Sequence, residues 1–288
     1  MDPDTTGTPP FDLAVFDLDG TVLGRDSRVT DRTVAAVDRL SGLGVRIVVA
    51  TGRRFEGAHQ HAARLGLGPG DPVICYGGSM VRRMDGGTLL HRTLSRAVSV
   101  EFLDWATCRG LHARVFTDGR IALGPDTPGA AAYLRHPAGP GVFSVGSPAR
   151  WLREEAGEEP TKLAIADSPA GVESWLREAQ EAFAGRLFLT RSHSYYVEVM
   201  APESAKSTAL AFLCNRWGID PGRVIAFGDA DNDIDMLCFA GHGVAVGPMT
   251  DAVRQAADIV VPSTHDDGVA KYLEELLEEN HRSGLRKH

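Results

Sequence analysis

Short apolar runs alternate with helical patterns at the beginning of this chain, and glycine-rich junctions separate them. The predicted strands are residues 11–16, 45–50 and 72–76, and the helices between them are residues 30–43 and 55–65. Strands that alternate with helices in this way pair in parallel, with the helices as crossovers. The pattern therefore predicts an α/β fold with a doubly wound, Rossmann-like parallel sheet.

The alternation stops near Val81 and returns after Pro202. Between them, two short strands flank an Asp118-Gly119 turn, which is typical of a β-hairpin. Residues 125–160 are rich in Gly, Pro and Ala and are expected to be irregular. At roughly 150 residues per domain, 288 residues suggest two domains. We predict a disordered N-terminus at 1–10, a core domain from 11–82 and 203–288, and an inserted α/β domain at 83–202.

The charge balance excludes some classes of partner. The chain has 30 basic and 38 acidic residues, a net charge of -8, whereas nucleic-acid binding favours a basic face. The first ten residues lack the basic head and apolar stretch of a signal peptide, and no apolar run reaches the ~18 residues of a membrane span. We expect a cytoplasmic protein without nucleic-acid or membrane partners. The sequence leaves its oligomeric state open.

Two aspartates stand where the first predicted strand ends, in Asp17-Leu18-Asp19-Gly20-Thr21. The two-residue period of a strand places Asp17 and Asp19 on one side. Two such charges 4 Å apart repel by about 4 kcal/mol at an effective dielectric constant of about 20. A cation between them would relieve this repulsion, and Mg²⁺ prefers hard oxygen ligands. The alternative is an Asp-Gly turn with a capping aspartate.

A second acidic cluster follows the predicted strand at residues 224–227, in the sequence Gly228-Asp229-Ala230-Asp231-Asn232-Asp233. Asp233 alone could be an N-terminal helix charge. However, ligands of open α/β sheets bind at the carboxyl ends of strands. Two strand ends with acidic clusters therefore indicate one shared site.

Two further segments could serve an anion at the same edge. Thr51-Gly52-Arg53 follows the second strand, where a hydroxyl and backbone N–H groups could hold phosphate oxygens. Lys206 opens the helix after the inserted domain and could balance the carboxylates. The alternatives are a helix cap at Thr51 and a solvated surface charge at Lys206.

In this order, the four segments resemble the haloacid dehalogenase superfamily of phosphotransferases. Its DxDGT motif falls on residues 17–21, its Thr motif on 51–53, its Lys on Lys206 and its GDxxND motif on 228–233. Asp267-Gly268-Val269-Ala270-Lys271 is similar to the ending of the Cof-type subfamily, and the insertion is similar to that subfamily's larger α/β cap. The resemblance covers nearly the whole chain after the first ten residues.

The resemblance implies a role for each matching residue. Asp17 would attack phosphorus and form an aspartyl-phosphate, and Asp19 would act as general acid and then as base. Mg²⁺ would be bound by Asp17, the backbone carbonyl of Asp19, and Asp229, with Asp233 holding the water shell. The transferring phosphoryl group would contact Thr51, Gly52, Lys206 and Asn232.

Asp19 favours phosphate esters over carbon–halogen bonds, because an alkoxide leaving group needs a proton and a halide does not. We therefore expect a Mg²⁺-dependent phosphatase acting on a small phosphorylated metabolite, a sugar phosphate or phosphorylated cofactor. The alternatives are a sugar-phosphate mutase or phosphotransferase, and a non-catalytic protein that binds phosphometabolites. Side chains near the end of the inserted domain could select the substrate, or could simply pack in strands: His193, Tyr195, Tyr196 and Glu198.

Two positions depart from the Cof-type pattern. Tyr76-Gly77-Gly78-Ser79 stands where an Asn-Gly pair is usual, and Gly247-Pro248 stands where Gly-Asn is usual. Both departures remove amide side chains that could contact the substrate or its phosphate.

Overall fold

The computed structural model describes residues 10–24, 26–134 and 140–285. The described chain divides into two compact units, one running up to Leu89 and resuming at Lys206, the other comprising Leu90–Ala205. We call them the core and the cap. Residues 1–9, most of the segment predicted to be disordered, lie outside the described residues.

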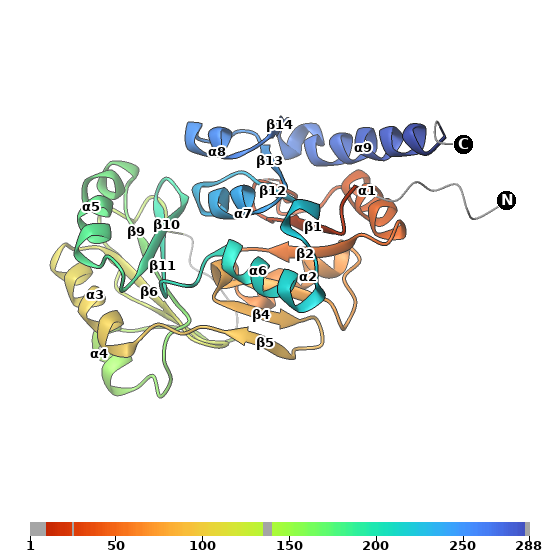
Figure 1. Ribbon diagram of the computed structural model, residues 1–288. Helices are drawn as coiled ribbons and strands as arrows, with labels where there is room; N and C mark the ends of the chain where they lie inside the picture. The colour runs from red at the N-terminus through yellow and green to blue at the C-terminus, as the bar shows by residue number, and fades with distance from the viewer. Residues whose placement is uncertain (1–9, 25, 135–139, 286–288) are drawn as a thin grey trace. The chain divides into compact units, whose positions relative to one another are not determined.

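The core contains an eight-stranded sheet in the order β14-β13-β12-β1-β2-β3-β4-β5 (Figure 1). Its strands are β1 (Leu13–Phe16), β2 (Arg46–Ala50), β3 (Pro72–Cys75), β4 (Met80–Arg83), β5 (Thr88–His91), β12 (Val224–Gly228), β13 (His242–Val246) and β14 (Ile259–Val261). Its helices are α1 (Asp31–Gly42), α2 (Phe55–Arg64), α6 (Lys206–Trp217), α7 (Ile234–Phe239), α8 (Asp251–Ala256) and α9 (Gly268–Leu285).

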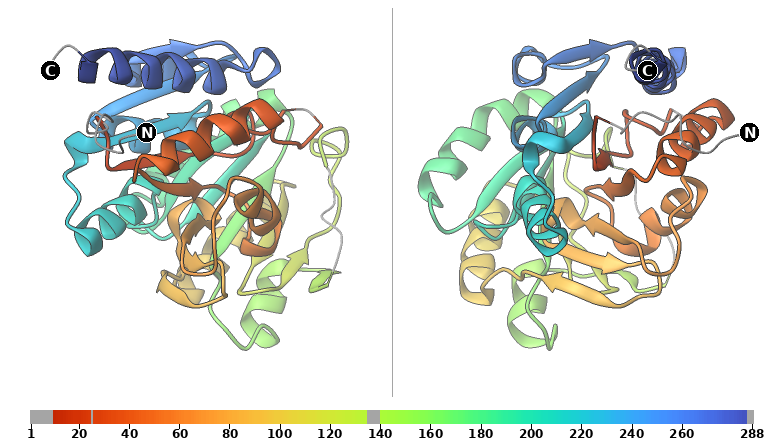
Figure 2. Two further views of the ribbon diagram at one scale, coloured as in Figure 1. Left: turned by 90° about the vertical axis from the view of Figure 1, so that its right-hand side faces the viewer. Right: turned by 45° about the vertical axis from the view of Figure 1, so that its right-hand side comes forward.

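The six strands from β14 to β3 are parallel. From the centre of the sheet, the chain runs outward from β1 to β2 and β3 on one side and from β12 to β13 and β14 on the other. Right-handed crossovers then place the helices on opposite faces of the sheet. Helices α1 and α9 lie side by side, whereas α6 packs beside α7 (Figures 1 and 2). This confirms the predicted doubly wound α/β fold.

Local signals explain several boundaries. Thr30 caps α1, because its side chain accepts a hydrogen bond from the backbone N–H of Thr33 at 3.2 Å. Strand β1 is buried along its whole length, as expected for the central strand of a parallel sheet. Strand β4, which was not predicted, pairs antiparallel with β3, so the core sheet continues past residue 82 to β5.

The cap contains a six-stranded sheet in the order β10-β11-β9-β6-β7-β8. Its elements are α3 (Arg96–Cys108), β6 (His112–Phe116), β7 (Ile121–Leu123), β8 (Val142–Ser144), α4 (Pro148–Glu154), β9 (Lys162–Ala166), α5 (Pro169–Ala182), β10 (Phe188–His193) and β11 (Tyr196–Met200). The three helices pack on one face of the sheet, where Val115, Leu163 and Val197 join their apolar core.

The predicted hairpin is present as the antiparallel pair β6 and β7. The prediction that residues 125–160 are irregular is wrong in part, because β8 and α4 lie within them. Among the described residues, no helix has both the length and the apolar character needed to cross a membrane.

Candidate active site

Asp17 and Asp229 follow two neighbouring strands. In the pairing of β1 and β12, Phe16 lies opposite Phe227, and the backbone N–H of Asp17 donates to the carbonyl of Phe227 at 3.0 Å. The connections on the two sides of this pair run in opposite directions, so the aspartates lie at the crevice where open α/β sheets bind ligands. Asp17, Asp229 and Asp233 each contribute one carboxylate oxygen, and these three oxygens lie within 4.8 Å of one another. The structure thus brings together Asp17 from the first strand end with Asp229 and Asp233 from the second.

The turn after β1 holds the Asp229 carboxylate. The Thr21 hydroxyl donates to Asp229 Oδ1 at 2.7 Å. Gly20 has a φ of +91°, and a Cβ atom built on it would lie 2.1 Å from Asp229 Oδ2. Gly20 is therefore needed both for its left-handed backbone and for the close approach of Asp229.

Lys206 lies between two of the carboxylates. Its Nζ donates to Asp17 Oδ1 at 2.5 Å and to Asp233 Oδ1 at 2.6 Å. The Lys206 side chain is only 1% exposed, so the alternative of a solvated surface lysine is wrong. A buried ammonium group with two carboxylates fixes the rotation of both.

Asp233 also shapes the backbone. Its Oδ2 accepts hydrogen bonds from the backbone N–H groups of Asp229 and Ala230, both at 3.1 Å. Both Asp233 oxygens therefore have protein donors. The role of Asp233 is not limited to placing a negative charge at a helix N-terminus. It holds the loop that carries Asp229.

Burial and mutual repulsion shift the pKa values of the cluster. Burial raises the pKa of the Asp17 carboxyl well above its ordinary value, although the Lys206 charge opposes the rise. Burial also raises the pKa of Asp229 to about 7, and the nearby Asp233 contributes. Burial lowers the pKa of Lys206, but Asp17 and Asp233 more than reverse this, so it lies above its ordinary value. The three carboxylates together carry more negative charge than the single ammonium group of Lys206 can balance.

The donor set fits a divalent cation. Close carboxylate oxygens are the ligands preferred by Mg²⁺ and similar hard ions, and an ion there would offset the remaining repulsion. The side chain of Asp19 is not part of this cluster. Its carboxylate instead pairs with Arg53.

The predicted phosphate-binding residues occupy two segments. Thr51 follows β2, the other neighbour of β1, and is 1% exposed. Its Oγ1 accepts the backbone N–H of Arg53 at 3.2 Å, so it closes the local turn rather than capping α2, whose N-cap is Arg54. Gly52 is half-buried in the same turn, and Asn232 is half-buried in the single turn of 3₁₀-helix Asp231–Asp233.

Arg53 is the residue that sequence reasoning left without a role. Its Nε and Nη2 donate to the two oxygens of Asp19 at 2.7 and 2.5 Å. The sequence signal that could have indicated a role for Arg53 is its position beside Thr51 and Gly52 in one motif. The spacing of Asp19 and Arg53 along the chain gives no indication that they pair.

The departure at Gly77 preserves a backbone conformation. Gly77 has a φ of +66°, in the left-handed region that glycine and asparagine adopt most readily. Glycine in place of the usual asparagine therefore keeps the turn after β3 while removing the amide.

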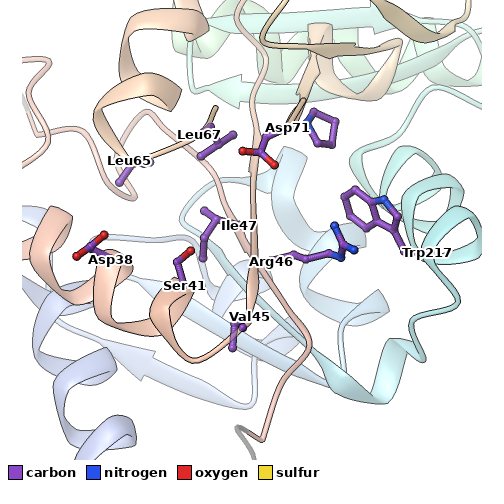
Figure 3. A pocket seen from close by; sticks show the side chains of 12 residues that line it. Asp38, Ser41, Val45, Arg46, Ile47, Leu65, Leu67, Asp71 and Trp217 are labelled. Atoms are coloured by element: carbon purple, nitrogen blue, oxygen red, sulfur yellow. The ribbon is translucent and has the colours of Figure 1, made fainter. Parts of the chain in front are cut away.

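A cavity of about 350 Å³ lies elsewhere in the core (Figure 3). Val45, Arg46 and Asp71 line it near the first residues of β2 and β3, and the Arg46 guanidinium lies over the Trp217 ring at 4.9 Å. The acidic cluster lies at the opposite, carboxyl ends of the strands. The cavity is therefore separate from the candidate active site.

Within the cap, Glu198 differs from the other proposed selectivity residues. Lys162 Nζ donates to its Oε1 at 3.0 Å, and the two side chains are 3% and 4% exposed. Its Oε2 is buried without a hydrogen-bond partner in the described part of the chain. By contrast, His193 is exposed and stacks on Tyr195.

The chain is similar to known proteins over most of its length. A family model described as haloacid dehalogenase-like hydrolase matches residues 14–273. A Bacillus subtilis protein named 5-amino-6-(5-phospho-D-ribitylamino)uracil phosphatase is 30% identical over 280 residues, covering 94% of this chain and 98% of its own. A Klebsiella pneumoniae HMP-PP phosphatase is 29% identical over 239 residues, covering 82% and 84%.

The fold is shared with solved structures. A phosphatase of the haloacid dehalogenase superfamily from Bacteroides thetaiotaomicron superposes with a TM-score of 0.78 at 23% identity, covering 96% of this chain and 97% of that one. The family match spans nearly all of the described core and cap. The chain therefore belongs to the haloacid dehalogenase-like hydrolases of Cof type and is a phosphoric monoester hydrolase.

Proposed function

We propose that the protein is a Mg²⁺-dependent phosphatase that hydrolyses a small phosphorylated metabolite through an aspartyl-phosphate on Asp17. The observation that supports this most is the buried Asp17 carboxylate, held at Oδ1 by Lys206 and within 4.8 Å of oxygens of Asp229 and Asp233. Phosphoryl transfer needs mainly positioning and charge stabilisation, and this cluster can provide both.

In the first step, a carboxylate oxygen of Asp17 attacks phosphorus while the bond to the leaving alcohol oxygen breaks. Asp19 gives its proton to that oxygen. In the second step, Asp19 takes a proton from water, the water oxygen attacks phosphorus, and the bond to Asp17 breaks. Inorganic phosphate leaves, and Asp17 and Asp19 return to their starting states.

Lys206 keeps Asp17 in one rotamer and, with Thr51, Gly52 and Asn232, would contact the phosphoryl oxygens. Asp17, Asp229 and the backbone carbonyl of Asp19 would hold the metal ion, and Asp233 would hold its water shell. A bound Mg²⁺ would reduce the repulsion between the anionic nucleophile and the anionic substrate.

We propose a sugar phosphate or a phosphorylated cofactor or cofactor precursor as substrate. The two relatives are named for small phosphate-bearing molecules.

The test is phosphate release from a panel of phosphorylated sugars and cofactors and from an aryl phosphate, with Mg²⁺ and with a chelator. We expect activity that the chelator abolishes and Mg²⁺ restores, and a loss of more than about 10³-fold in Asp17→Asn. Wild-type turnover by Asp17→Asn would refute the proposal. An isomerised sugar phosphate would identify a mutase, and binding without turnover a binding protein.

A further inference from the structure

The Asp19 carboxylate is held by a two-point contact with Arg53. Nε of Arg53 donates to Oδ2 at 2.7 Å and Nη2 to Oδ1 at 2.5 Å. A planar guanidinium that binds both oxygens fixes the plane as well as the position of a carboxylate. This orientation matters for a group that must meet a leaving oxygen within hydrogen-bond distance.

Arg53 is itself held from several sides. Its backbone N–H donates to Thr51 Oγ1 at 3.2 Å, and its carbonyl accepts the backbone N–H of Tyr76 at 2.9 Å. Its Nη1 lies 3.0 Å from Nε2 of His61 and 3.4 Å from the carbonyl of Gly57. The guanidinium is therefore fixed independently of Asp19.

His61 must accept the hydrogen bond from Arg53, because a guanidinium only donates. The imidazole is then neutral, with its proton on Nδ1. Burial and the Arg53 charge lower the pKa of His61, which agrees with a neutral ring. His61 is 8% exposed and forms a fixed support behind Arg53.

Stability does not account for this arrangement. The side chains of Arg53 and Asp19 are 27% and 42% exposed, and exposed ion pairs typically contribute only about 0–1 kcal/mol. A carboxylate that transfers a proton must keep one orientation toward the substrate. A firmly anchored arginine that binds the half-exposed carboxylate of Asp19 provides this.

We propose that Arg53, supported by His61, is a positioning residue that aims the Asp19 carboxylate at the leaving oxygen of the substrate. The inference rests on the proposed function, in which Asp19 transfers that proton. The effect of losing Arg53 on the reaction rate depends on the leaving group of the substrate. An alkyl alcohol leaves slowly without a proton, whereas a nitrophenolate leaves readily without one.

The experiment compares p-nitrophenyl phosphate with the best alkyl phosphate from the substrate panel, in Arg53→Met, Arg53→Lys and Asp19→Asn. We expect Arg53→Met to lower kcat on the alkyl phosphate by about 10–100-fold and on the aryl phosphate by no more than about 3-fold, with KM little changed. Arg53→Lys should recover only part of the loss, because an ammonium group cannot bind both oxygens in a fixed plane.

The chain offers a matched control at the other end of β1. Arg223 makes the same two-point contact with Asp12, at 2.6 and 2.8 Å, with side chains 39% and 43% exposed. Arg223→Met removes an equivalent ion pair away from the candidate site. It should change the alkyl and aryl rates equally or not at all.

The outcomes separate the two proposals. If Asp19→Asn loses alkyl activity selectively and Arg53→Met does not, the positioning role is wrong and the proposed function stands. An equal loss on both substrates in Arg53→Met, with a lowered melting temperature, also overturns the positioning role. Failure of Asp17→Asn to lose activity overturns the proposed function itself.

Discussion

Phe16 and Phe227 are register partners in the parallel strands β1 and β12, and their rings stack with centroids 4.8 Å apart. Both side chains are fully buried. Asp17 follows one of them directly, and Asp229 follows the other by two residues. The separation of these carboxylates is therefore set by backbone pairing and core packing.

We predict that Lys206→Met strongly destabilises the protein. The substitution leaves Asp17 and Asp233 buried without their cation, and breaking a buried ion pair in this way typically costs about 3–5 kcal/mol. Urea denaturation in the presence of a chelator measures this free energy, and added Mg²⁺ should restore part of it. Lys271→Met is the control because Lys271 is exposed, and it should change stability by less than about 0.5 kcal/mol. Equal stability of the two variants would contradict the prediction.

We predict that Gly20→Ala has two effects: it strains the backbone at residue 20, and it displaces the Asp229 carboxylate. Any residue with a side chain at this left-handed position costs about 1–2 kcal/mol. In addition, the new Cβ would push Asp229 away from its place beside Thr21. Phosphatase activity should therefore fall sharply, and Mg²⁺ should be needed at higher concentration.

Gly66→Ala separates these two effects. Gly66 has a φ of +88°, nearly that of Gly20, but among the described residues nothing lies within 4 Å of the position that its new Cβ would take. It should lose similar stability in thermal denaturation while keeping its activity. Comparable activity in both variants would mean that the Asp229 contact is unimportant.

In the cap, we predict that Glu198→Ala costs about 3–5 kcal/mol, because it breaks the buried ion pair with Lys162 by removing one partner. The double variant Lys162→Met/Glu198→Leu should recover most of this loss, since apolar side chains of similar volume can replace a buried ion pair. Chemical denaturation of the single and double variants measures the coupling. Additive losses would show that the ion pair does not act as a unit.

We predict that His61 contributes to the pH dependence of stability. Its folded-state pKa lies below the ordinary value of 6.5, so the unfolded chain binds the proton more readily. The stabilisation is complete above 6.5 and is lost as the pH falls below it toward the folded-state pKa. His61→Asn should therefore flatten the decline in unfolding free energy below pH 6.5, measured by urea titration across that value. An unchanged slope would count against this account.

The meeting of Asp17 and Asp229 could be predicted from sequence because both follow short apolar strands, and parallel strands end at the same edge of a sheet. Regular secondary structure fixes their positions, so local patterns were sufficient. The pairing of Asp19 with Arg53 could not be predicted in this way. It depends on the rotamers of two half-exposed side chains after different strands.

Helix α4 was missed for a different reason. Its start has a recognisable signal, because Ser147 accepts the backbone N–H of Arg150 and Pro148 opens the first turn. However, the helix has only seven residues, and its buried face consists mainly of Trp151 and Leu152. A helix this short depends on tertiary packing, which the surrounding glycines and prolines gave no reason to expect.

The central strand pair β1 and β12 is built from segments separated by the whole cap. During synthesis β1 leaves the ribosome early, but one of its two neighbours is translated only after residue 223. Until then the Asp17 segment has one open edge and no acidic partner from β12. If the proposed mechanism holds, the newborn polypeptide stays catalytically incompetent until most of it has been made, and a prematurely terminated product lacking β12 would be inert toward phosphate esters.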